Sequence, residues 1–136
     1  MFKRFVNTVL IISLSFTLSG CKPDAMILFN SCPITKENLL NNATEFTAGK
    51  KFYYIFINQT PLKTNMIRVR LLKREEKAHY EINKLVYSND FRLNKDQVYY
   101  YNDYLVLYEA GHYYMVIYAR DSLDRPLASA DFRIKN

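Results

Sequence analysis

Polar and apolar residues alternate along much of this chain with a period of two, the spacing of a β-strand that buries one face. Ile67, Val69 and Leu71 alternate with Arg68 and Arg70, which predicts a half-buried strand with an arginine face. Other runs rich in aromatic and β-branched residues predict further strands, and these lie at residues 52–57, 80–87, 99–101, 104–108, 113–120 and 128–134. The runs 99–101 and 104–108 could be one bent strand or two.

Turn-forming residues separate these runs, among them Ser88-Asn89-Asp90 and Ala110-Gly111. Only residues 35–40 and 74–85 compete as helix. The second segment has poor apolar spacing, so we interpret it as a charged hairpin loop that feeds a strand. The pattern therefore predicts an all-β fold, an antiparallel β-sandwich of about 6–8 strands.

The segment Gly111-His112-Tyr113 connects two of the strand-like runs. It resembles the tyrosine corner of immunoglobulin-like and fibronectin-III-like domains, in which a Tyr hydroxyl bonds back to the preceding backbone. The resemblance implies an immunoglobulin-like sandwich with Gly111 and Tyr113 as structural corner residues. Met115 stands where antibody domains place a Cys, which implies a version of this fold without the inter-sheet disulfide.

An uncharged apolar run at residues 5–18 follows Lys3 and Arg4 and leads into Ser19-Gly20-Cys21. These features resemble the signal peptide and lipobox of bacterial lipoproteins. The resemblance implies cleavage between Gly20 and Cys21 and a diacylglycerol on the Cys21 sulfur. A membrane-spanning helix needs about 20 apolar residues, more than this run offers; an ordinary signal peptide is the remaining alternative.

The predicted organisation is a cleaved signal peptide at 1–20, a lipidated stem at 21–45 and a β-sandwich at 46–136. The lipoprotein resemblance places the chain in the cell envelope, where the lipid on Cys21 binds the membrane. In Gram-negative bacteria, Lys22 rather than Asp after the cysteine favours the outer membrane.

The charge and the cysteine count limit the possible partners. The net charge of +6 falls once Lys3 and Arg4 are removed, and no dense Lys/Arg stripe is present, so no nucleic-acid partner is expected. With Cys21 lipidated, Cys32 has no intramolecular partner for a structural disulfide. We expect Cys32 to be a small buried residue, with an intermolecular disulfide or a reactive thiol as alternatives.

The sequence contains none of the common catalytic, metal-binding or phosphate-binding motifs. His79 and His112 are the only histidines, and we expect both to be surface residues. Asp121 and Asp124 are interpreted as shaping a hairpin turn rather than holding calcium. We therefore expect no enzymatic activity, no cofactor and no metal.

The best binding candidates are the arginine face and the tyrosine-rich segment around residues 99–104. Exposed Tyr offers a large contact area with a polar tip, although cross-strand aromatic packing is the alternative for these tyrosines. The candidate binding surface consists of Arg68, Arg70, Tyr99, Tyr100, Tyr101 and Tyr104.

These features favour a non-enzymatic, membrane-anchored module that binds a cell-envelope protein. The alternative is an inhibitor or exclusion lipoprotein that acts on an incoming hydrolase or phage. It would need a protruding segment, for which residues 58–65 and 73–79 are the candidates.

Overall fold

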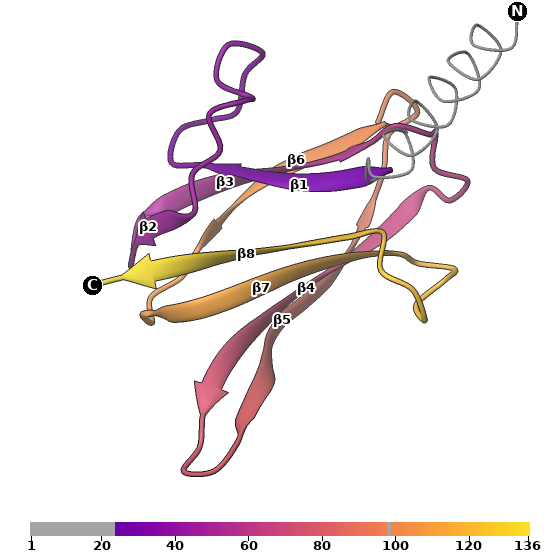
Figure 1. Ribbon diagram of the computed structural model, residues 1–136. Coiled ribbons are helices and arrows are strands. Elements are labelled where there is room, and N and C mark those ends of the chain that lie inside the picture. The colour runs from indigo at the N-terminus through magenta and orange to yellow at the C-terminus, as the bar shows by residue number, and fades with distance from the viewer. Residues whose placement is uncertain (1–23, 98) are drawn as a thin grey trace, which may run out of the picture.

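The computed structural model describes residues 24–97 and 99–136, so the predicted signal peptide and Cys21 lie outside the described part of the chain. Within these ranges two β-sheets pack face to face (Figure 1). Their strands are β1 (Ala25–Asn30), β2 (Glu45–Thr47), β3 (Lys51–Asn58), β4 (Met66–Glu76), β5 (Glu81–Arg92), β6 (Tyr100–Val106), β7 (Gly111–Ala119) and β8 (Ala128–Lys135). None of the described residues belongs to a helix long and apolar enough to cross a membrane.

The smaller sheet has the strand order β1-β3-β6 and the larger sheet has the order β2-β8-β7-β4-β5. The prediction of an all-β, immunoglobulin-like sandwich is confirmed. One detail departs from a wholly antiparallel arrangement, because the short strand β2 pairs in parallel with the end of β8. β2 thereby covers one edge of the larger sheet, whereas β5 leaves the other edge open.

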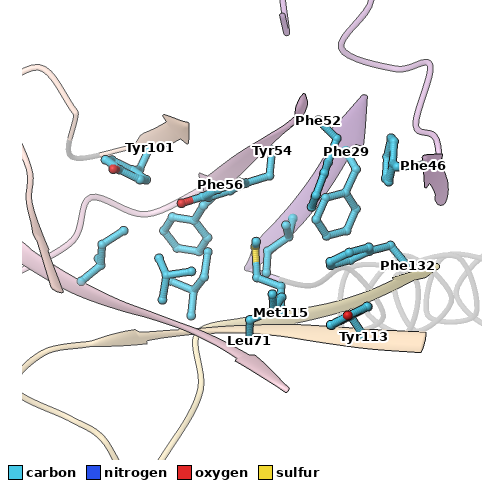
Figure 2. Packing of buried hydrophobic residues seen from close by; sticks show 14 of the residues in the cluster. Phe29, Phe46, Phe52, Tyr54, Phe56, Leu71, Tyr101, Tyr113, Met115 and Phe132 are labelled. Atoms are coloured by element: carbon cyan, nitrogen blue, oxygen red, sulfur yellow. The ribbon is translucent and has the colours of Figure 1, made fainter. Parts of the chain in front are cut away.

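The core follows from the period-two alternation of the strands. β3 turns Phe52, Tyr54 and Phe56 inward, and all three are almost completely buried. Figure 2 shows Phe52 grouped with Phe29, Phe46 and Phe132 at one end of the core. The ring centroids of these four residues lie between 4.7 and 6.5 Å apart, distances at which aromatic pairs attract one another. The aromatic cluster thus packs β1 and β3 of the smaller sheet against β2 and β8 of the larger sheet.

The sandwich begins earlier than the sequence predicts. β1 lies inside the predicted stem at 21–45, pairs antiparallel with β3, and buries Ile27 and Phe29. The boundary predicted at residue 46 is therefore wrong. The alternation of Ile27 and Phe29 is too short to indicate a strand by itself, and the pairing with β3 is what stabilises it.

The β4–β5 hairpin is also longer than predicted. β5 continues through Ser88-Asn89-Asp90, which we expected to be a turn, and β4 continues through residues 74–76, which we expected to be part of a loop. The turn itself lies at residues 77–80. Because β7 pairs with β4 only as far as Lys73, the end of the hairpin projects beyond the larger sheet (Figure 1).

The start of β7 contains the hydrogen bond that is expected of a tyrosine corner, from the Tyr hydroxyl to the preceding backbone. The Tyr113 hydroxyl donates a 2.6 Å hydrogen bond to the carbonyl oxygen of Glu109, and the Tyr113 ring stacks on Phe132 at 5.6 Å. Burial raises the pKa of the Tyr113 hydroxyl. At Gly111 the lysine of β4 crosses so closely that a Cβ would lie 2.7 Å from Lys73 Cε. A glycine at this position therefore leaves room for the Lys73 side chain.

Candidate functional site

The two predicted binding elements lie on opposite outer faces of the sandwich. Arg68 and Arg70 are on the outer face of the larger sheet, whereas Tyr100 and Tyr104 are exposed on the outer face of the smaller sheet. Tyr99, just before β6, is also exposed. The predicted residues therefore cannot contact one partner as a single surface.

Tyr101 does not belong to a binding surface. Its side chain points into the core, where it is 9% exposed and lies 5.0 Å from the Phe91 ring. Its hydroxyl donates a 2.9 Å hydrogen bond to Asp103, and burial raises the Tyr101 pKa. The candidate assignment of Tyr101 is thus wrong, because successive residues of a strand point to opposite faces.

Arg68 is occupied by ion pairs within the sheet. Its Nε and Nη2 atoms donate to the two carboxylate oxygens of Asp90 at 2.7 and 3.2 Å. Arg120 Nε donates to the same carboxylate at 2.9 Å. Hydrogen bonds from the two arginines hold the pKa of Asp90 below its usual value. Arg68 therefore joins β4 to β5 and is poorly placed to bind a partner.

Arg70 has no such ion pair. Its guanidinium carbon lies 5.3 Å from the centroid of the Tyr118 ring, and its Nε is buried without a hydrogen-bond partner. None of the described carboxylates forms a salt bridge with it. A buried donor without an acceptor costs free energy, and a planar guanidinium matches a carboxylate well. Arg70 is therefore the side chain on this face best suited to donate hydrogen bonds to an acidic group of a partner.

The residues around Arg70 form a continuous surface on the larger sheet. Cross-strand pairing places Leu72 beside Tyr114, and Arg74 Nη1 lies 3.5 Å from the Tyr114 hydroxyl. Arg74 also pairs with Glu81 across the hairpin. We call this surface the arginine–tyrosine face, and it consists of Arg70, Leu72, Arg74, Tyr114, Val116 and Tyr118.

Tyr114 and Tyr118 were not among the predicted site residues. They alternate with Tyr113, Met115 and Ile117, which are buried, so the period-two pattern of this strand already contains the signal. Tyr and Arg are both enriched at protein–protein interfaces. The arginine–tyrosine face thus has the composition of a protein-binding surface.

The face continues onto the projecting hairpin. β5 has no neighbouring strand on its outer side. Leu71 pairs with Tyr87 and Leu72 pairs with Leu85, so Val86 is the extra residue of a β-bulge on β5. We call the exposed apolar residues at this end of the hairpin the hairpin arm, and they are Tyr80, Ile82, Leu85 and Val86. Leu85 pairs directly with Leu72, so the hairpin arm adjoins the arginine–tyrosine face.

The remaining candidates do not assemble into a chemical site. In residues 24–97 and 99–136, no group of three or more His, Cys, Asp or Glu side chains could hold a metal ion. Asp124 accepts a 3.1 Å hydrogen bond from Ser122 within the β7–β8 turn. Cys32 is exposed in the loop after β1, so the expectation that it is buried is wrong. It lies beyond the last inward-facing position of that strand.

His112 lies at the edge of the arginine–tyrosine face. Its Nε2 is 2.8 Å from a carboxylate oxygen of Asp131 on β8, and its ring lies 4.9 Å from the ring of Tyr114. A shallow hollow next to it is lined by Arg74, Arg133 and Lys135, among others. His112 and Asp131 therefore extend the arginine–tyrosine face toward β8.

Comparison with known proteins identifies no family for this chain, and the solved structures that it resembles are distant. No family model and no curated protein matches this chain. A CARDB domain from Pyrococcus furiosus, in complex with di-metal ions, is 11% identical at a TM-score of 0.40, over 82% of this chain and 93% of that one. Superoxide reductase (neelaredoxin) from Ignicoccus hospitalis is 14% identical at a TM-score of 0.41, over 68% of this chain and 73% of that one.

An alkylpurine DNA glycosylase from Pseudomonas fluorescens is 9% identical at a TM-score of 0.43 over 90% of this chain, and the match spans 33% of the glycosylase. At these sequence identities and TM-scores, the functions of the three proteins cannot be assigned to this chain. The β-sandwich architecture rests on the strands and sheets themselves.

Proposed function

We propose that this protein is a lipid-anchored, non-enzymatic module that binds another cell-envelope protein through the arginine–tyrosine face. The observation that carries the proposal is Arg70, whose guanidinium is held over Tyr118 and forms no salt bridge with any described carboxylate. The Arg70 side chain is partly exposed, so an acidic side chain of a partner could pair with its charge. Arg is over-represented where planar, two-point recognition of a carboxylate matters.

The direction of the strands supports this proposal. β1 begins at the end of the sandwich where β3 stops and β4 starts, as the pairing of Ala25 with Asn58 shows. β4 then runs away from that end, so the turn at 77–80 lies at the opposite end (Figure 1). A lipid on Cys21 would therefore hold one end at the membrane while the hairpin arm extends toward a partner.

The proposal is tested by chemical crosslinking and pull-down of the tagged, lipidated protein from its native membrane. We expect a discrete partner that is retained by wild type and lost in Arg70→Ala and Tyr118→Ala. Arg125→Ala is the matched control, since it removes the same group from an exposed position in the β7–β8 turn. Thermal unfolding of each variant establishes that it is folded.

Loss of the partner in Cys21→Ala would show that the complex also requires the lipid. A partner retained by both Arg70→Ala and Tyr118→Ala would contradict the assignment of the face. The absence of any discrete partner in every lane would contradict a stable complex altogether.

The hairpin arm favours a second candidate function, inhibition or exclusion of an incoming hydrolase or phage. The arm projects beyond the larger sheet and bears Tyr80 at 62% exposure and Leu85 at 52%. Such a projection could enter the cleft of an enzyme. Screening soluble hydrolases against the Cys21→Ala chain would test it. Inhibition that is lost in Tyr80→Ala but kept in Arg70→Ala would favour this function over the first.

A further inference from the structure

An uncharged and mostly apolar patch covers part of the outer face of the smaller sheet. The strand register places its six residues in two adjacent rows across β1, β3 and β6, namely Met26–Ile57–Tyr100 and Leu28–Ile55–Asn102. We call these residues the Met26 patch. Met26 is 36% exposed and Tyr100 is 39% exposed. The next row contains Tyr104. Lys51 Nζ lies 4.4 Å from the centroid of the Tyr104 ring, so a positive charge marks the end of the patch.

The Met26 patch lies where the chain joins the sandwich. The Gln59 N–H donates a 2.8 Å hydrogen bond to the Asp24 carbonyl oxygen, so the backbone is attached to the domain from Asp24 onward. Only three residue steps separate Cys21 from Asp24. A fully extended chain advances at most about 3.6 Å per residue, which limits this tether to about 11 Å.

Such a short tether brings the domain to the bilayer surface. The headgroup region of one leaflet is roughly 5–8 Å thick, so a lipid on Cys21 leaves little room between the sandwich and the headgroups. The connections at this end contain charged side chains, among them Lys63, Asp121 and Asp124, which water solvates well. The Met26 patch is an uncharged surface of the described residues that begins next to the point of attachment, since Met26 follows Asp24 by two residues.

The composition of the patch suits a bilayer interface. Tyr is enriched at membrane–water interfaces, where its ring lies among the headgroups and its hydroxyl stays hydrated. Tyr99 adjoins Tyr100 and is 49% exposed, so two aromatic rings are available at this end. Burial of apolar area, rather than attraction to anionic lipids, would drive the contact.

We propose that the Met26 patch, together with Tyr99, rests on the headgroup–acyl boundary of the membrane that holds the lipid anchor. This inference rests on the anchor in the proposed function. It also orients the molecule, because the arginine–tyrosine face lies on the opposite sheet and is turned away from the bilayer. The two outer faces then have different partners, a lipid surface and a protein.

The chain contains no tryptophan, so one introduced indole reports its own surroundings. The lipidated Tyr100→Trp protein is reconstituted into phosphatidylcholine vesicles with and without brominated phosphatidylcholine. We expect a blue-shifted emission and a loss of most of that emission with the brominated lipid. Tyr99→Trp provides a second position outside the strands, should Tyr100→Trp not fold.

The control is Tyr108→Trp at the opposite end of the sandwich, where Tyr108 is 80% exposed. It should emit as a solvent-exposed indole and lose no emission. Mass spectrometry of the same samples measures the lipid on Cys21. A chain without that lipid mass would overturn the anchor and this inference with it. A lipid-bearing chain in which both Tyr99→Trp and Tyr100→Trp stay unquenched would overturn the membrane contact alone.

Discussion

The corner hydrogen bond of Tyr113 makes a quantitative prediction about stability. Tyr113→Phe removes one hydroxyl and keeps the ring that stacks on Phe132 at 5.6 Å. The Glu109 carbonyl oxygen then loses a donor at 2.6 Å. Tyr113 is only 2% exposed, whereas Glu109 is an exposed residue. The bond should therefore contribute the net value of an ordinary intramolecular hydrogen bond, about 0.5–1.5 kcal/mol.

This cost is large enough to measure by thermal or urea-induced unfolding. A loss of about 1 kcal/mol lowers the Tm of a domain of about 100 residues by about 4 °C. We therefore expect Tyr113→Phe to unfold roughly 2–6 °C below wild type. The urea m-value should stay unchanged, since the buried area is nearly the same.

Tyr108→Phe is the matched control, because it removes the same hydroxyl from a side chain that is 80% exposed. Its stability should stay within about 0.5 kcal/mol of wild type. Equal stability of Tyr113→Phe and Tyr108→Phe would refute the reasoning, since the corner bond would then contribute nothing. A smaller m-value in Tyr113→Phe would instead indicate that the substitution altered the folded or unfolded state.

Three further predictions concern single residues. Gly49 has a φ of +81° with no close neighbour for a Cβ, so Gly49→Ala should lower the free energy of unfolding by about 1–2 kcal/mol through backbone strain alone. Burial raises the pKa of Tyr54, so stability should fall as pH rises above about 10, where an unfolded Tyr ionises; Tyr54→Phe should flatten the pH dependence of urea unfolding measured between about pH 9 and 11. The pKa of Asp90 is lowered by Arg68, so its contribution should be present above the ordinary Asp pKa of about 3.9 and be lost as pH falls below it. Asp90→Asn should lose this acid dependence, and an unchanged acid transition would contradict the ion-pair account.

The alternation of residues within a single segment predicted which side chains of a strand face the core and which face solvent. The alternation of Ile67, Val69 and Leu71 with Arg68 and Arg70 describes the two faces of β4 correctly. The same rule, applied residue by residue, separates Tyr101, which is buried, from Tyr100, which is exposed. Strand periodicity is a property of the backbone and needs no knowledge of partners.

Features that depend on pairing between strands could not be predicted from single segments of the sequence. β1 is a six-residue strand that exists because β3 lies beside it. Ser88-Asn89-Asp90 has the composition of a turn, but in β5 it forms cross-strand pairs with Arg70, Val69 and Arg68. A polar segment can remain extended at a sheet edge, since its outward side chains stay in water.

The candidate site could be predicted only in part for the same reason. The arginines and the tyrosines were identified as chemical types, but their distribution over two opposite faces depends on strand order. The order β2-β8-β7-β4-β5 is what places Tyr114 and Tyr118 beside Arg70 and Arg74. Strand order is not encoded in any single segment of the sequence.

The position of β1 has a mechanical consequence. Tension applied between Asp24 and the turn at 77–80 would act nearly parallel to the strands, because these points lie at opposite ends of the sandwich. The hydrogen bonds between β1 and β3 are perpendicular to the strands, so such a load would shear all of them together instead of opening them one at a time. Pulling β1 sideways, by contrast, would break one bond after another. The protein should therefore resist force along its long axis far better than force across it.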